Sequence, residues 1–138
     1  MSRLVIIESP YSGGPARGIW DRLTFGPLRR RRRNVRYARA AMADCLSRGE
    51  LPIASHLLYT QPGVLRDWLP HERRMGITAG LLWAEAAQAW ALAAGGRDVA
   101  RVVYVDQGRS RGVEGGVEHA RNICQLTEFR SIPGWATR

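Results

Sequence analysis

Short apolar runs alternate with longer segments of helical periodicity along the chain. The apolar runs have the length and composition of buried strands, and they span residues 4–7, 51–54, 99–106 and 126–129. Between them, apolar residues recur at helical spacing over about 34–48, 70–94 and 117–124. Strands that alternate with helices in this order predict an α/β fold, a three-layer sandwich with a mostly parallel sheet and right-handed crossovers.

One stretch interrupts this alternation. Residues 14–33 are rich in glycine and proline, show no sustained period and end in five consecutive arginines, Arg29–Arg33. Because adjacent like charges repel and the stretch has little apolar content to bury, we expect a loop insertion carrying a solvated arginine cluster outside the main site. The remainder of residues 1–138 is expected to form a single domain.

Length and hydropathy narrow the class of protein. With 138 residues, of which 45% are hydrophobic, the chain can supply one core. No run approaches the ~20 apolar residues that a membrane-spanning helix needs. The apolar run at 4–7 is too short for the apolar region of a signal peptide, so a cytoplasmic location is expected.

The charge is strongly positive and carried by one residue type. All 21 basic residues are arginine, and the formal net charge is +9. Arginine donates two parallel hydrogen bonds to a phosphate, so this excess favours nucleotides or nucleic acid as partners. A GC-rich genome would also remove lysine, and composition alone does not separate these explanations.

The sequence offers no metal site. Cys45 and Cys124 lack metal-ligand spacing and are expected to be buried thiols. His71 and His119 also lack companions at useful spacing. We therefore expect neither a metal nor a cofactor.

The predicted topology locates a candidate ligand site. In open parallel sheets, ligands bind outside the carboxyl ends of the strands, where loops and helix starts converge. The loop at 106–112 has glycines that allow close backbone approach, and the helix after it would direct its positive end at an anion. The candidate binding residues at this edge are Ser9, Tyr11, Ser55, Glu72, Arg73, Asp106, Ser110 and Gly112.

His56 is a candidate catalytic residue at the same edge. It could orient a base or donate a proton near neutral pH, or it could be a histidine hydrogen-bonded beneath a loop. Trp83 and Trp90 are expected to pack on the sheet or on a partner subunit.

Five segments, in order, resemble a family of small bacterial and phage proteins that is grouped with the nucleoside 2-deoxyribosyltransferase-like superfamily. They are residues 7–13 (IESPYSG), 34–38 (NVRYA), 52–59 (PIASHLLY), 72–80 (ERRMGITAG) and 104–113 (YVDQGRSRGV). The resemblance implies a flavodoxin-like sheet, a homo-oligomer, and binding of a nucleoside or nucleoside 5′-monophosphate.

The resemblance also implies a chemistry, from which this chain departs. Catalytic members of the superfamily are transferases and hydrolases in which a helix glutamate attacks the anomeric carbon of the sugar. Aligning Ser110 and Gly112 puts Gly116 at that position. Glu114 and Glu118, two residues to either side, would be turned about 200° away on a helix. Local unwinding at the neighbouring glycines could let either carboxylate act.

Three functions are compatible with the sequence. The first is cleavage or transfer at the N-glycosidic bond, as a deoxyribosyltransferase or N-glycosidase. The second is a nucleotide-binding or sequestering protein that has lost the catalytic glutamate. The third, expected to be weak, is binding of nucleic acid through Arg29–Arg33.

Overall fold

The sheet contains four parallel strands. The computed structural model describes residues 2–95 and 98–137, and its strands are β1 (Leu4–Glu8), β2 (Leu51–Ile53), β3 (Val99–Tyr104) and β4 (Leu126–Arg130). They are arranged in the order β2-β1-β3-β4. Each neighbouring pair is parallel, and Leu4 of β1 is paired with both Leu51 and Val99. All four strands therefore end at the same edge of the sheet.

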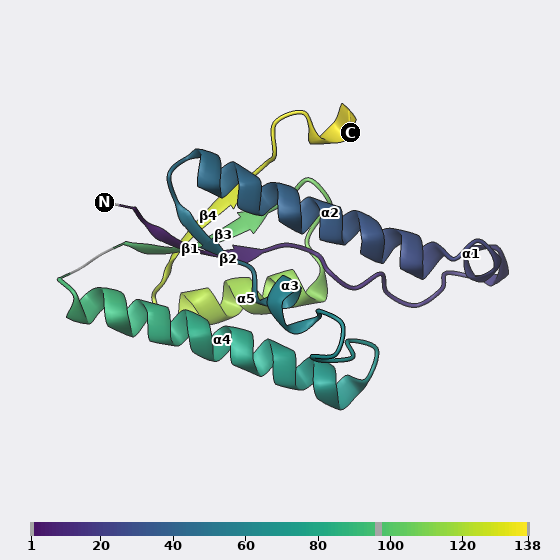
Figure 1. Ribbon diagram of the computed structural model, residues 1–138, viewed down its shortest axis with the longest axis horizontal. Coiled ribbons are helices and arrows are strands. Elements are labelled where there is room, and N and C mark those ends of the chain that lie inside the picture. The colour runs from purple at the N-terminus through teal and green to yellow at the C-terminus, as the bar shows by residue number, and fades with distance from the viewer. Residues whose placement is uncertain (1, 96–97, 138) are drawn as a thin grey trace.

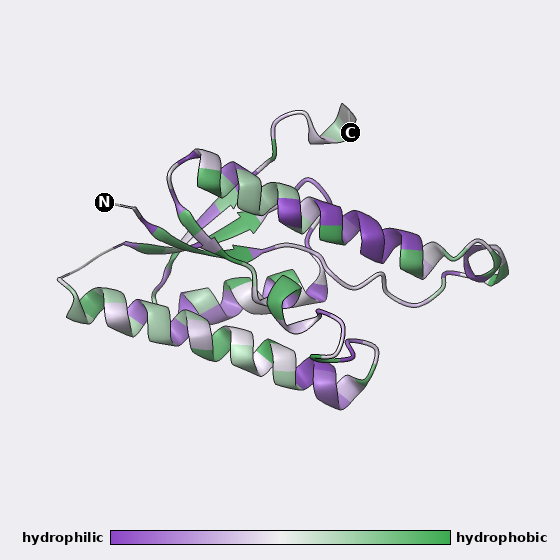
Figure 2. Ribbon diagram, in the orientation of Figure 1, coloured by the Kyte–Doolittle hydropathy of each residue, from purple (hydrophilic) through white to green (hydrophobic). Residues whose placement is uncertain are grey.

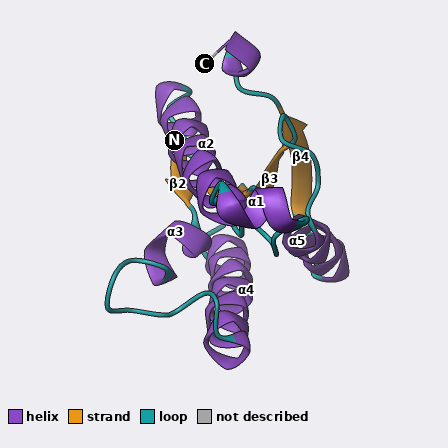
Figure 3. Ribbon diagram, turned by 90° about the vertical axis from the view of Figure 1, so that its right-hand side faces the viewer, coloured by secondary structure: helices purple, strands orange, loops and turns teal. Residues whose placement is uncertain are grey.

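Helices cover both faces of this sheet (Figures 1 and 3). One face is covered by α2 (Gly26–Ser47), and the other by α4 (Pro70–Ala93) and α5 (Arg111–Asn122). The shorter elements are α1 (Ile19–Leu23), α3 (Ser55–Tyr59) and the C-terminal turn η1 (Trp135–Thr137). The predicted fold is confirmed, since this is a flavodoxin-like three-layer α/β sandwich.

Alternate residues of β3 show how the layers are held together. Ala100, Val102 and Tyr104 pack in the cluster beneath α2, while Val99 and Val103 contact α4 and α5. All six residues of β3 are buried. A strand covered on both faces needs apolar residues at successive positions, which explains the continuous run in the sequence.

The expected loop at 14–33 is wrong from residue 19 onwards. Residues 19–23 form α1, and α2 begins at Gly26, so all five arginines of the cluster lie in the first turns of a 22-residue helix. Arginine is a good helix former, and Pro27 occupies a position at the helix start that tolerates proline. Figure 2 shows this strongly hydrophilic half of α2, which extends past the carboxyl ends of the strands.

Other boundaries also differ from the expected ones. The last helix begins at Arg111 rather than near Val117, because the hydroxyl of Ser110 caps it by accepting the Val113 N–H. Residue 34, the expected start of the first helix, lies inside α2, which begins at Gly26. Cys45 is buried as expected, but Cys124 is exposed. Within the described residues, no helix has the length and apolar character required to cross a membrane.

Candidate functional site at the carboxyl edge

The loop that follows β1 and the helix α3 that follows β2 bring three candidate residues together. Ser9 Oγ and His56 Nε2 share a hydrogen bond of 3.0 Å. The ring of Tyr11 meets the His56 imidazole edge-on, with 5.7 Å between ring centroids. Because β1 and β2 are parallel neighbours, the loop after β1 emerges beside the start of α3, which is why Ser9 and Tyr11 contact His56 of that helix.

The His56 imidazole is neutral near pH 7. Burial disfavours its charged form and lowers its pKa to about 4. The lowered pKa of His56 disfavours the expected role as a proton donor near neutral pH in the protein without ligand. A neutral imidazole can still orient a ligand, because one ring nitrogen donates a hydrogen bond and the other accepts one.

Helix α2 holds the loop that carries Tyr11. Asn34 Nδ2 donates to the backbone carbonyls of Tyr11 at 3.2 Å and of Ser12 at 3.1 Å. Arg31 Nη2 donates to the Tyr11 hydroxyl at 3.2 Å, and its guanidinium lies 5.4 Å from the centroid of the Tyr11 ring. The arginine cluster is thus in direct contact with the candidate site.

A second polar cluster lies beneath α5, at the end of β1. Arg101 of β3 is fully buried, and its Nη1 donates to Glu8 Oε1 at 2.8 Å and to the carbonyl of Gly116 at 3.1 Å. A Cβ atom added to Gly116 would lie 2.4 Å from the Glu8 carboxyl carbon. The Glu8 carboxyl group therefore fills the space that a side chain at position 116 would need.

Glu8 is an unusual carboxyl group. Its burial raises its pKa, and the neighbouring Arg101 guanidinium only partly offsets this increase. The Glu8 side chain nevertheless remains 19% exposed at the end of β1.

The remaining hydrogen bonds of Arg101 tie this cluster to the helices. Its Nε donates to Gln125 Oε1 at 2.9 Å, and its Nη2 lies 3.0 Å from His119 Nδ1. His119 Nε2 in turn lies 2.8 Å from Glu85 Oε1 on α4. Every nitrogen of the buried guanidinium therefore has a partner, which a buried cation requires.

Asp106 and Ser110 lie in the loop after β3, and both make structural hydrogen bonds. Asp106 Oδ2 accepts from the Tyr37 hydroxyl at 2.6 Å and from the Ile132 N–H at 2.9 Å. Ser110 caps α5, and Gly112 lies exposed in its first turn. Between them, Gln107 Nε2 is buried without a hydrogen-bond partner, which leaves a donor that a ligand could satisfy.

The side chains of Ser55, Glu72 and Arg73 make their contacts away from the Ser9–His56 pair. Ser55 Oγ packs against α4, where a Cβ added to Gly80 would lie 2.5 Å from it. Glu72 accepts from the backbone N–H and guanidinium of Arg66, and Arg73 lies 3.6 Å from Asp67. The Glu72–Arg66 and Arg73–Asp67 pairs connect the start of α4 to the loop between α3 and α4. This loop borders a separate cavity of about 400 Å³.

Glu114 and Glu118 lie on the exposed side of α5. Glu114 forms an ion pair with Arg109 at 2.5 Å, and Glu118 is exposed. The helix is continuous through Gly115 and Gly116, so the unwinding that would redirect these carboxylates is not observed. Neither carboxylate is brought to the place that Glu8 fills.

Sequence reasoning missed the Glu8–Arg101 pair. A usable signal was present, because Arg101 is a charged residue inside an otherwise apolar strand, and a buried charge needs a partner. Across residues 2–95 and 98–137, no group of three or more His, Cys, Asp or Glu side chains is placed to hold a metal ion.

Comparison with known proteins identifies a family, but that family has no assigned activity. Residues 3–130 match a family model described as Domain of unknown function (DUF7768). The searches found no significant match among curated proteins or among solved structures.

Proposed function

The chain belongs to the DUF7768 family, and we propose that it binds a nucleoside or nucleoside 5′-monophosphate and cleaves or transfers at its N-glycosidic bond. The motifs that resemble the nucleoside 2-deoxyribosyltransferase-like superfamily support the choice of ligand. Three of them contain residues at the carboxyl edge, including Tyr11, His56 and Ser110.

One observation carries the catalytic part of this proposal. The carboxyl group of Glu8 fills the space beside Gly116, the position at which the resemblance implies a nucleophilic glutamate. A carboxylate supplied by β1 can therefore take the place of one supplied by α5. Its partial exposure at the strand end gives a substrate access to it.

The chemistry proceeds in two balanced steps. A Glu8 oxygen attacks the anomeric carbon, a C–O ester bond forms, and the C–N bond to the base breaks with its electron pair passing to the base nitrogen, which takes up a proton. Water then hydrolyses the ester and restores the carboxylate, or a second base accepts the sugar. Arg101 favours the ionised form of Glu8 that the first step needs.

The other groups at the edge bind and orient the ligand. The neutral His56 imidazole and the Tyr11 ring are suited to a base or a sugar, and Ser9 fixes the imidazole. A 5′-phosphate suits the start of α5, where backbone N–H groups and Arg111 lie close together.

The test uses the same substitution at two glutamates. The protein is incubated with a panel of nucleosides and 5′-monophosphates, and release of free base is followed by chromatography. We expect Glu8→Gln to lower the rate by on the order of 10³-fold or more, while Glu118→Gln on the exposed side of α5 leaves it unchanged. Loss of activity in Glu118→Gln, with full activity in Glu8→Gln, would assign the reaction to α5.

A second function is favoured by one feature of the same cluster. The Arg101 guanidinium donates a hydrogen bond to the Glu8 carboxylate and neutralises its charge, and such an ion pair can be purely structural. In that case the protein is a nucleotide-binding or sequestering protein without glycosyl chemistry. Thermal stabilisation by a nucleotide with no release of base from any member of the panel would establish this function instead.

A further inference from the structure

We propose that the groove between α2 and the α3 region binds a single strand of nucleic acid, with the arginines of α2 contacting its phosphates. The groove has a volume of about 790 Å³. Six of its lining residues are arginines of α2, namely Arg29, Arg31, Arg32, Arg33, Arg36 and Arg39. The groove is also lined by Tyr11, Leu57 and Pro62.

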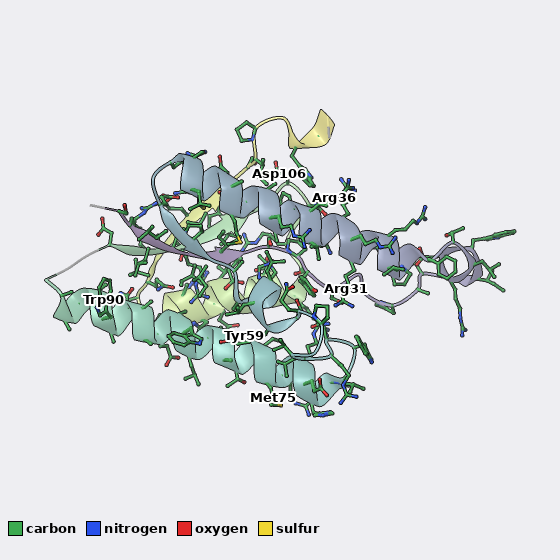
Figure 4. All side chains as sticks on the ribbon, in the orientation of Figure 1. Arg31, Arg36, Tyr59, Met75, Trp90 and Asp106 are labelled. Carbon is green, nitrogen blue, oxygen red and sulfur yellow. The ribbon has the colours of Figure 1, made fainter. Side chains whose placement is uncertain are left out.

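The arginines form a row along one side of α2. Arg29, Arg32, Arg36 and Arg39 are spaced three, four and three residues apart, which places them on one face of a helix. At 1.5 Å per residue the row is about 15 Å long. In Figure 4, Arg31 and Arg36 lie on the half of α2 that extends beyond the strand ends.

In the described part of the chain, most of the six arginines that line the groove have no internal partner. Within the described residues, the side chains of Arg32, Arg33, Arg36 and Arg39 make no hydrogen bond or ion pair. By contrast, Arg30 on the same helix is engaged by Asp21 at 2.8 Å and by backbone carbonyls. Unneutralised guanidinium groups gathered in a groove create a positive potential that a phosphate chain can neutralise.

The shape of the groove favours a single strand over other polyanions. A bilayer surface or a duplex presents its phosphates on a broad convex or flat surface, which contacts the rim of a groove but does not fill it. A single strand can enter the groove and place unpaired bases against Tyr11, whose aromatic ring is part of the lining and can stack with a base.

This inference does not depend on the proposed glycosyl chemistry. Glu8 does not line the groove, so strand binding and base release are separable properties. The groove and the candidate site share Tyr11, which lines the groove and contacts His56. A strand lying in the groove would place a nucleotide beside the candidate site.

The experiment measures binding of fluorescently labelled ten-nucleotide DNA and RNA strands by anisotropy, over a series of salt concentrations. Arg32→Ala/Arg36→Ala removes two arginines of the groove. The control Arg74→Ala/Arg121→Ala removes two exposed arginines of α4 and α5, also without internal partners and outside the groove. Both variants lose two positive charges, so net charge alone cannot produce a difference between them.

We expect the groove variant to weaken binding by at least about tenfold and to reduce the slope of log K against log salt by about 1.4, since two phosphates on a single strand are no longer neutralised. The control should bind like the wild type. Tyr11→Leu should weaken binding to an intact strand but not to an abasic strand of equal length.

Four results would overturn the inference: no strand binding at low salt, equal losses in the groove and control variants, tighter binding to a duplex than to a single strand, or tighter binding to vesicles of anionic lipid. Glu8→Gln should bind the strand like the wild type. If it does so and no base is ever released, the glycosyl proposal fails while the groove stands.

Discussion

The carboxyl group of Glu8 and the Cα of Gly116 are in such close contact that a Cβ at position 116 would lie 2.4 Å from the Glu8 carboxyl carbon. The glycine at the position where the resemblance implies a nucleophile is therefore also the residue that makes room for another carboxyl group. This complementarity between β1 and α5 is the basis of the first prediction.

Gly116→Ala should displace Glu8 from Arg101 and destabilise the protein by about 1–3 kcal/mol, the usual cost of overpacking a tight site. Gly115→Ala is the matched control, because no atom lies within 4 Å of its added Cβ. Alanine there should raise stability by up to ~1 kcal/mol through helix propensity. Urea denaturation measures both changes, and equal effects at the two glycines would refute the contact.

Removal of Arg101 should be more damaging than removal of Glu8. Arg101→Met leaves the Glu8 carboxylate without its cation in a largely buried position, which costs on the order of 3–5 kcal/mol. Glu8→Gln/Arg101→Met should recover part of this loss, since the unpaired carboxylate is gone. The unfolding free energies of wild type, Glu8→Gln, Arg101→Met and the double variant form a double-mutant cycle. Strictly additive losses of stability would show that the two side chains are not coupled.

Glu8 should also make stability depend on pH. Its folded-state pKa lies above the ordinary value of 4.5, so its stabilising contribution is complete below that value and is lost as pH rises through the folded-state pKa. Glutamine does not titrate, and wild type should therefore lose stability relative to Glu8→Gln as pH rises from acid to neutral. Denaturation of both proteins across this pH range measures the difference between their free energies of unfolding. A difference that is independent of pH, or that shifts in favour of wild type as pH rises, would contradict the prediction.

Nucleoside 5′-monophosphates should stabilise the protein more than the corresponding nucleosides. The reason is the start of α5, where Ser110 and Gly112 lie beside Arg111 and can surround a phosphate. A ligand at about 100 times its dissociation constant should add about 2.7 kcal/mol to the free energy of unfolding. Thermal denaturation with both ligand forms checks this, and equal shifts would rule out a phosphate subsite.

Self-association is expected to use α4. This helix exposes large apolar side chains along its length, among them Met75 (58%), Leu82 (57%), Trp83 (57%) and Leu92 (67%). Figure 4 shows Met75 and Trp90 near opposite ends of the same helix. An apolar surface of this extent on a helix favours burial against a second copy.

Trp83→Glu should therefore shift the protein toward monomer in sedimentation equilibrium. Leu46→Glu, which places the same charge at a similarly exposed apolar residue of α2, should have no effect. A wild type that is monomeric at all concentrations would exclude this interface.

The sequence by itself determined the fold class and the edge of the sheet at which three of the candidate residues meet. Apolar runs and helical spacing are local properties, so they located all four strands and the start of α4 at Pro70. Parallel strands follow from helices placed between them, and this brings Ser9, Tyr11 and His56 to one edge.

Local reasoning was least reliable where charges gather. The five arginines were expected in a loop because like charges repel, yet they lie in a helix in which Arg30 pairs with Asp21 and Arg31 contacts Tyr11. These contacts of Arg30 and Arg31 with residues outside the helix reduce the repulsion, and such partners cannot be assigned from spacing alone.

Only the tertiary structure decided which carboxyl group fills the site and what each polar residue binds. Glu8 and Gly116 come from opposite ends of the chain, and their contact exists because β1 and β3 pair while α5 packs over them. The pKa values of Glu8 and His56 follow from burial, which depends on every layer around them. Elements form from local patterns, whereas the environment of a side chain is set by the residues that packing brings beside it.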